Sequence, residues 1–324
     1  MSNLRLVVYN SVMESANQML DPPNYELALL SALRVARMSD AAAITRLLNS
    51  TRFAHYHVDW RLPVDWLGDP GFLVVPQDAE MKAERRMPGL FWARDEILAC
   101  LVVTQDPAPA AWVRLAAVSA QLDLCVVLGE MFAVMTEYLR ETAVTEVGWL
   151  VMDPWPIKVL PDLGFLEFSA IETYIKKDLE RPLIKPVPDL RIRPVAVDDF
   201  ERLAAMETAV FEPLWRFSQE TLRLARRDAV SFDVALLDDL LVGYQISSGG
   251  RLGAHLVRLT IAPHMQGRGI GTAIFAHAIE GYQKRGYQHI TLNTQIDNDA
   301  SHHLYKKFGF SPSGEKFPLW VMPM

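Results

Sequence analysis

The stretch from Val257 to Gly271 constrains the fold of this chain more than any other. It reads V-R-L-T-I-A-P-H-M-Q-G-R-G-I-G. The apolar run at 257–262 predicts a buried strand, and Pro263 ends it. A glycine-rich turn then leads into an apolar-periodic helix that we expect to start near Ile270. A strand that runs through such a turn into a helix is typical of α/β proteins that bind a phosphate group.

The glycines of this turn indicate its chemistry. Pyrophosphate oxygens need several backbone N–H groups at close range, and Gly267, Gly269 and Gly271 leave that approach open. The helix N-terminus adds unpaired N–H donors and the positive end of its dipole, and Arg268 adds charge. A P-loop is excluded because no Lys follows the glycines. A dinucleotide fingerprint fits poorly because Thr272 stands where the third small residue belongs.

The pattern that fits is Q-x-x-G-x-G at residues 266–271, followed by N-x-x-A/S-x-x-L-Y-x-x-x-G-F at residues 298–310. Together they resemble the GNAT superfamily of coenzyme A-dependent N-acetyltransferases, and this part of the chain is similar to the mycothiol synthase and ribosomal-protein-alanine acetyltransferase types. The resemblance implies acetyl-CoA as co-substrate and no metal. It implies direct attack by a primary amine, from a small molecule or a peptide, in a ternary complex.

The resemblance also implies roles for individual residues. The pantetheine arm would lie between strands 257–262 and 289–294, and the backbone N–H of Ile261 or Leu259 would face the thioester carbonyl. Tyr305 would be the general acid, since a tyrosine with its ordinary pKa near 10 stays protonated. The implied cofactor-binding residues are Leu259, Ile261, Gln266, Gly267, Arg268, Gly269, Ile270, Gly271, Thr272, Asn298 and Ser301.

Two residues are candidates for the general base. His255 stands where several family members have Glu, and strand alternation puts it on the face of Leu259 and Ile261 if no bulge intervenes. An imidazole with a pKa near 6.5 can accept a proton at neutral pH. Glu212, in the segment F-E-P, is the second candidate. A histidine at this place without a catalytic role is the alternative.

The chain contains an internal repeat. Val113-Arg114-Leu115 recurs 144 residues later as Val257-Arg258-Leu259, and a hairpin predicted at 90–101, with its turn at 94–96, matches one at 234–245. We therefore expect an α/β (α+β) fold of two tandem GNAT-like domains. Each would have a mixed, mainly antiparallel central sheet flanked by helices.

The domains are expected at 34–185 and 186–324, after a leader at 1–33. A Pro-punctuated linker at 180–188 separates them. The first copy lacks the chemistry, because L-D-L-C-V-V at 122–127 replaces the glycine turn and Asp123 would repel an anion. We predict that only the second domain is catalytic.

The first copy is also predicted to carry an insertion, rich in Trp, His and Pro, between its first helix and its hairpin at residues 55–71. We expect these rings to cover the core of the first domain. The alternative is an interdomain, homodimer or partner surface. His55 and His57 could line a pocket, although lone histidines are usually structural.

Composition limits the function classes. A net charge of −7, without a basic half, argues against nucleic-acid binding. No apolar run is long enough for a membrane span. Cys100 and Cys125 are expected to be buried free thiols, so we expect a cytoplasmic protein. Metal binding is not predicted, because no cluster has ligand spacing and the adjacent pair His302-His303 diverges on a helix.

Two other functions stay open at this point. The chain could be a non-enzymatic acetyl-CoA-binding scaffold or sensor, or a mycothiol synthase-like enzyme of small-thiol metabolism. Retention of both Asn298 and Tyr305 argues for catalysis, whereas the altered first copy and His255 in place of Glu argue against the mycothiol substrate.

Overall fold

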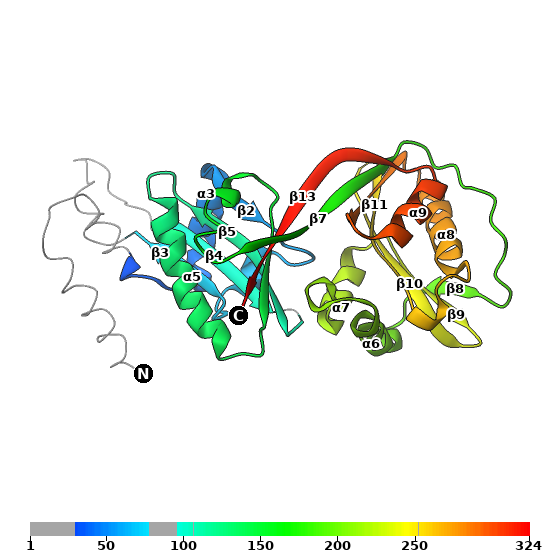
Figure 1. The fold of residues 1–324 in the computed structure, drawn as a ribbon, viewed down its shortest axis with the longest axis horizontal. Helices are drawn as coiled ribbons and strands as arrows, with labels where there is room; N and C mark the ends of the chain where they lie inside the picture. The colour runs from blue at the N-terminus through cyan, green and yellow to red at the C-terminus, as the bar shows by residue number, and fades with distance from the viewer. Residues whose placement is uncertain (1–29, 78–95, 106, 252) are drawn as a thin grey trace, which may run out of the picture.

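The computed structural model describes residues 30–77, 96–105, 107–251 and 253–324. Most of the expected leader and residues 90–95 of the first expected hairpin lie outside the described residues. The described chain forms two lobes side by side, joined by two long crossing strands (Figure 1). Residues before and after 185 are called the first half and the second half below.

The first half contains β1 (Arg34–Val35), η1 (Met38–Asp40), α3 (Ala41–Ser50), β2 (Phe53–Tyr56), η2 (Pro63–Trp66), β3 (Phe72–Pro76), β4 (Ile97–Gln105), β5 (Ala110–Val118), α5 (Leu124–Arg140), β6 (Glu146–Leu150), η3 (Trp155–Lys158) and β7 (Leu166–Lys176).

The second half contains β8 (Arg191–Pro194), η4 (Val197–Asp199), α6 (Phe200–Val210), η5 (Pro213–Trp215), α7 (Gln219–Asp228), β9 (Ser231–Leu237), β10 (Leu240–Gly249), β11 (Gly253–Ile261), η6 (Pro263–Met265), α8 (Ile270–Lys284), β12 (His289–Gln295), α9 (Asp299–Lys307) and β13 (Ser311–Pro323).

The strands of both halves join into one continuous sheet with the order β1-β3-β4-β5-β6-β13-β7-β12-β11-β10-β9-β8, and β2 pairs with β5. Among the described strands, β5–β6 and β11–β12 are the parallel neighbours, and the other pairs are antiparallel. The prediction of mixed, mainly antiparallel sheets flanked by helices is therefore confirmed. The prediction did not include the fusion of the two sheets.

The fusion arises because each half places its last strand beside a strand of the other half. β7 pairs with β12, and Leu292 lies opposite Tyr174. β13 pairs with β6, and Val321 lies opposite Gly148. The C-terminus consequently lies against the first half (Figure 1). β7 and β13 also pair with each other, so they form the seam of the molecule.

Matching ion pairs mark the internal repeat at the entry to each half. Arg34 contacts both carboxylate oxygens of Asp40 at 2.7 and 2.9 Å, and the N–H of Arg37 donates to the same carboxylate. In the second half Arg193 contacts Asp199 at 2.7 and 2.8 Å, and the N–H of Ala196 donates to it. These bidentate bonds are the strong type, and they fix the start of the first helix in each copy.

The structure corrects the predicted insertion. The spacing from the end of α3 to the start of β3 is close to that from α6 to β9, so residues 55–71 are not extra. The added length lies instead between β3 and β4, where Pro76 and Ile97 bound a long connection, whereas β9 and β10 are joined through Asp238 and Asp239 alone. Among the described strands β4 lies between β3 and β5, both antiparallel to it, so β3 and β4 correspond to β9 and β10 of the second half.

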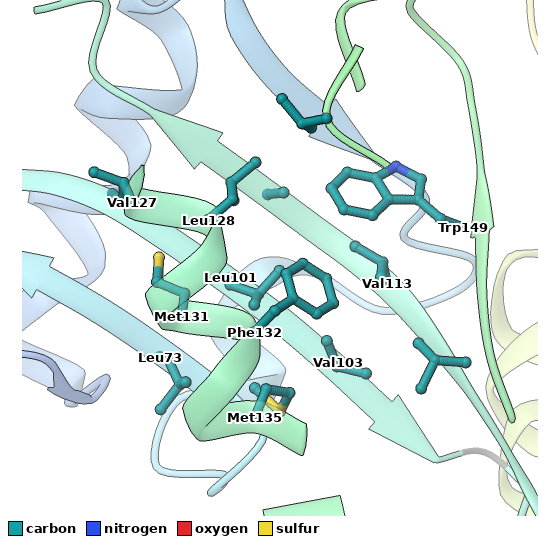
Figure 2. Close-up of a cluster of buried hydrophobic side chains, with 14 of the residues drawn as sticks. Leu73, Leu101, Val103, Val113, Val127, Leu128, Met131, Phe132, Met135 and Trp149 are labelled. Carbon is teal, nitrogen blue, oxygen red and sulfur yellow. The ribbon is translucent and has the colours of Figure 1, made fainter. Parts of the chain in front are cut away.

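Helix α5 covers one face of the sheet in the first half. α5 lies across the sheet with its apolar side chains directed at the strands (Figure 2). This apolar stripe at helical spacing excludes water from one face of the sheet. The helix residues are Val127, Leu128, Met131, Phe132 and Met135, and the strand residues include Leu101, Val103, Val113 and Trp149.

Helices cover both faces of the sheet in the second half. The hydroxyl of Tyr244, on β10, donates to Glu207 of α6. Ser247 lies three residues further along the same strand, and its hydroxyl forms a hydrogen bond with Tyr282 of α8. Since alternate side chains of a strand point to opposite faces, α6 and α8 lie on opposite sides of the sheet. The turn between β11 and α8 is therefore at the edge of the α8 face.

Candidate active site

The predicted glycine-rich turn forms between β11 and α8. Gly267 and Gly269 have φ values of 75° and 82°, in the region that favours glycine. Gly269 is the N-cap of α8 and provides no side-chain acceptor, so the first N–H groups of the helix are not capped by it. A Cβ on Gly267 would meet no described atom within 4 Å, so the turn is open on that side. An anion fits here.

β11 and β12 separate just before this turn. Their parallel pairing runs from Gly253 to Leu256 on β11 and stops there. The N–H of Ala262 donates to β10, and N–H groups alternate along a strand, so those of Leu259 and Ile261 point to the side that β12 has left. The gap therefore offers unpaired strand donors to an extended ligand, as predicted.

Tyr305 lies on α9 beside this gap. Its helix is started by Asn298, whose Oδ1 accepts from the N–H of Ser301 at 3.1 Å. The tyrosine is 6% exposed and packs against Phe275 and Phe310. Burial raises the pKa of Tyr305 to about 12, although a hydrogen bond with Ser301 and the charge of Arg258 oppose the increase. The phenol is thus protonated at neutral pH.

A cavity of about 480 Å³ opens in front of Tyr305, between the two halves. Both halves contribute to its wall. The first half supplies Tyr56, His57, Val58, Asp59, Trp112, Arg114, Leu150, Met152 and Ile171. The second half supplies Phe211, Leu214, Trp215, Arg216, Phe217, Val257, Arg258, Leu259, Asn293, Thr294, Gln295, Asn298, Ser301 and Tyr305.

Four of the predicted site residues line this cavity: Leu259, Asn298, Ser301 and Tyr305. Ile261 and the turn residues 266–272 are not in its wall; they continue from it along the end of β11 into α8. Gln266 donates from its side chain to the carbonyl of Ile261 at 3.2 Å, which ties the turn to the strand. The structure thus places the predicted cofactor residues along one path, from the cavity to the helix N-terminus.

The structure keeps both predicted bases out of the cavity wall. In β11 an extra residue, Val257, forms a β-bulge between Leu256 and Arg258, and this reverses the alternation on which the prediction depended. His255 therefore lies on the face opposite Leu259, where its Nδ1 is 2.8 Å from Thr291 Oγ1 and burial lowers its pKa. Glu212 is exposed on the surface.

Arg258 is a central cavity residue that the sequence analysis did not single out. Its guanidinium lies between the rings of Phe211 and Phe217, 4.2 and 3.9 Å from their centroids. It donates to the carbonyl of Trp215 at 2.7 Å and lies 3.4 Å from the carboxylate of the fully buried Glu207. These contacts hold the cation in one position.

The first half supplies a second set of polar residues that the sequence did not reveal as a site. The carboxylate of Asp59 pairs with Arg114 and lies 3.9 Å from His57 Nε2. Burial raises the pKa of Asp59, but the charges of Arg114, His57 and Arg258 outweigh it and leave the pKa below its ordinary value. Burial lowers the pKa of His57 to about 4, so its ring is neutral at pH 7.

Trp112 links this wall to the other half. Its indole N–H donates to the carbonyl of Leu214 at 2.8 Å, and its ring lies 5.8 Å from that of Trp215. The segment H-Y-H-V-D-W and the repeated V-R-L contained these residues, but the repeat alone did not show that two copies share one cavity. The V-R-L match also differs by one residue from the structural match. The bulge falls at Arg114 in β5 and at Val257 in β11, so Arg114 corresponds in structure to Val257.

The corresponding helix start in the first half is closed. At the N-cap of α5, where α8 has Gly269, stands Asp123, and its carboxylate accepts from the N–H groups of Cys125 and Val126 at 2.9 and 3.1 Å. A negative side chain therefore occupies the place of an anion. Cys125 is exposed, which corrects the expectation of a buried thiol, whereas Cys100 is buried as predicted.

The described residues provide neither a metal-ligand cluster nor a membrane-spanning helix. Within these parts of the chain, no group of three or more His, Cys, Asp or Glu residues is placed to hold a metal ion. Over the same described ranges, no helix is long and apolar enough to cross a bilayer.

Sequence comparison assigns the second half to a known family. Residues 197–310 match the Acetyltransferase (GNAT) family. The chain is 24% identical over 123 residues to a Bacillus subtilis protein named for alanine N-acetyltransferase activity on ribosomal protein bS18, covering 38% of this chain and 82% of that protein. It is 30% identical over 82 residues to N-alpha-acetyltransferase 30 of Schizosaccharomyces pombe, covering 24% of this chain and 55% of that protein.

Solved structures agree in fold over nearly the whole chain. A GCN5-related N-acetyltransferase from Sphaerobacter thermophilus has a TM-score of 0.58 at 15% identity, covering 90% of this chain and 95% of its own. A tandem GNAT protein from the clavulanic acid biosynthesis pathway has a TM-score of 0.56 at 14% identity, covering 90% and 98%. The fold is therefore that of the tandem GNAT proteins. Residues 197–310 therefore match a family of acetyltransferases in sequence, and the chain as a whole is similar in fold to tandem GNAT proteins.

Proposed function

We propose that the chain transfers an acetyl group from acetyl-CoA to a primary amine, by direct attack in a ternary complex, and that the active site lies in the second half. One observation carries the proposal. The gap between β11 and β12 runs from the buried phenol of Tyr305 to the uncapped start of α8, whereas Asp123 closes the matching start of α5.

The turn and the strand divide the binding work. N–H groups at the start of α8 and in the glycine turn meet phosphate oxygens, and Arg268 adds positive charge at the exposed rim. The co-substrate supplies a thioester, whose carbonyl gains negative charge as an amine attacks it. The N–H of Leu259 or Ile261 is directed to hydrogen-bond that oxygen, where fixed donors lower the barrier most.

Tyr305 supplies the proton for the departing sulfur. Its pKa of about 12 keeps the phenol protonated, and its position in the cavity wall puts the hydroxyl beside the gap. The amine must attack in its neutral form, and the ionisable residues of the wall favour this. Arg216, which has no described carboxylate partner, opposes a further positive charge there and so lowers the pKa of a bound ammonium.

Calorimetric titration with acetyl-CoA tests the location of the site. We expect Gly269→Trp to abolish binding, because a large side chain at a positive φ distorts and blocks the turn. Cys125→Trp is the matched control, at an exposed position in the first turn of α5, and should bind like wild type. Equal binding by wild type and Gly269→Trp would contradict the proposal.

The reaction is tested by measuring the release of coenzyme A. The acceptors are a panel of amines, peptides and a cysteine-glucosamine-inositol compound. Acetyl transfer to an amine supports the proposal. Tight binding of acetyl-CoA without acetyl loss to any amine would point instead to a non-enzymatic binding module.

A further inference from the structure

The cavity between the halves is rich in positive charge, although the chain as a whole carries −7. Of the described residues in its wall, three are arginines, Arg114, Arg216 and Arg258, and Asp59 is the one acid. A cavity with this lining attracts anions by its field.

Two of these arginines already have a carboxylate partner. Asp59 pairs with Arg114, and Glu207, just behind the wall, lies 3.4 Å from Arg258. Because each pair is close to neutral, Asp59 is poorly suited to bind the ammonium group of an acceptor. The remaining charge in the wall is that of Arg216.

Arg216 is held in place without an acidic partner among the described residues. Its Nε donates to the carbonyl of Phe211 at 2.8 Å, which orients the guanidinium, and no described carboxylate lies within ion-pair distance. Its terminal N–H groups thus carry an uncompensated charge at the cavity wall. A planar guanidinium fixed at one edge is well suited to bind a carboxylate with the other.

The two paired arginines add donors that nothing described accepts. The Nε atoms of Arg114 and Arg258 are both buried, and neither has a hydrogen-bond partner among the described residues. These Nε atoms have almost no accessible surface, so a ligand in the cavity would meet the terminal N–H groups of the arginines instead. A carboxylate only accepts hydrogen bonds, and it matches those terminal donors.

Arg258 also lies near the reacting end of the cavity. Arg258, Tyr305 and Asp59 line the same cavity, and the charge of Arg258 lowers the pKa of both other groups. An amine that attacks beside Tyr305 would therefore have any neighbouring acidic group within reach of Arg258.

We propose that the amine acceptor also carries a carboxylate, as an amino acid does, and that Arg216 and Arg258 bind this carboxylate in the cavity between the two halves. This inference rests on the proposed acetyl transfer and narrows it to one substrate class. It also gives the first half a role, because Arg114 and Trp112 close the cavity from that side.

Matched pairs of acceptors test the proposal: tyrosine against tyramine, and lysine against cadaverine. We expect a kcat/KM at least about tenfold higher for the carboxylated member of each pair, since a site built to bond a polar group rejects the analogue that lacks it. Arg216→Met should lower kcat/KM about 10- to 100-fold for the carboxylated members alone, with the Kd of acetyl-CoA unchanged. Arg227→Met, at an exposed position on α7, is the control.

Product binding gives a readout that does not depend on turnover. N-acetyltyrosine should bind wild type more tightly than N-acetyltyramine does, and Arg216→Met should remove the difference. The carboxylate proposal would be overturned if tyramine and cadaverine reacted as well as tyrosine and lysine. It would also be overturned if the two acetylated products bound equally or not at all. Acetyl-CoA binding and transfer to any amine would still support the proposed function, so the two failures are distinct.

Discussion

Arg114 and Arg258 lie at the β-bulges of β5 and β11, and both line the cavity that contains Tyr305. Each is paired with a carboxylate from another element, Asp59 after β2 and Glu207 on α6. A bulge re-aims the side chains of its strand, and here two bulges direct cations to one cavity. The cavity is therefore a product of both copies of the repeat.

Replacement of Tyr305 tests its role as the proton donor. Tyr305→Phe should lower kcat by about 10²- to 10⁴-fold, because a positioned acid contributes about that much, and the Kd of acetyl-CoA should not change. The acid must be protonated, and its pKa of about 12 means that it causes no loss of activity below about pH 11. Steady-state kinetics against pH would show both effects.

Tyr174 provides the control for that variant. Its ring lies 6.3 Å from that of Tyr305, but its hydroxyl donates to Glu172 and it does not line the cavity. Tyr174→Phe should keep nearly full activity. Equal rates for wild type and Tyr305→Phe across the pH range would remove Tyr305 as the acid.

Gly148 tests the packing between the halves. A Cβ at this position on β6 would lie 2.8 Å from Leu214 and 3.0 Å from Trp112. We expect Gly148→Ala to cost about 1–3 kcal/mol in the free energy of unfolding, as overpacking does, and to lower activity because both neighbours line the cavity. Urea unfolding and the acetyl-transfer assay measure the two effects.

Gly129→Ala is the matched control, since Gly129 lies inside α5 and a Cβ there meets nothing within 4 Å. It should stabilise the protein by about 0.5–1 kcal/mol. If Gly148→Ala behaved in the same way, the described contact with Leu214 would not be tight.

His55 should make the protein less stable in acid. It is completely buried, its Nε2 lies 3.2 Å from the carbonyl of Val113, and burial lowers its pKa to about 3. The unfolded chain binds a proton below pH 6.5 and the folded chain does not, so the free energy of unfolding falls as the pH drops from 6.5. At pH 5 the loss from this group is about 2 kcal/mol.

Urea unfolding at pH 7 and pH 5 measures this loss. In His55→Gln the free energy of unfolding should fall by about 2 kcal/mol less between pH 7 and pH 5 than it does in wild type. His303→Gln, at an exposed position, should match wild type. An unchanged difference in His55→Gln would mean that another group controls the acid sensitivity.

Asp123 should stabilise α5, and its removal should not create a second cofactor site. Asp123→Ala removes the acceptor for two helix N–H groups and should cost about 1 kcal/mol, whereas Glu137→Ala, exposed on the same helix, should have little effect. Calorimetry should still give one acetyl-CoA per chain, because the start of α5 contains no glycine. A second bound acetyl-CoA would contradict the assignment of one site.

The sequence predicted those parts of the fold that depend on local chemistry. The helix that starts at Ile270 was anticipated, because a glycine turn and an apolar periodicity act over a few residues, and the strand from His289 followed from the family resemblance. The tandem α/β arrangement followed from the repeat. The bulge at Val257 was not predictable from alternation, and this error moved His255 to the wrong face.

The shared cavity could not be predicted for a different reason. Asp59, Trp112 and Arg258 meet only because β7 and β13 bring the halves together, and no short-range pattern records that pairing. Residues 55–71 were noticed for their rings, yet their role in the cavity depends on the position of η5 in the other half. Fully buried Glu207 carried no motif at all.

The exchange of β7 and β13 also limits how such a chain can change over generations. One copy of a duplicated unit is ordinarily free to be deleted from its gene. Here deletion of the first half would remove the strand that covers β12, and loss of β13 would expose β6 of the first half. Unpaired sheet edges promote aggregation, so each copy makes the other indispensable.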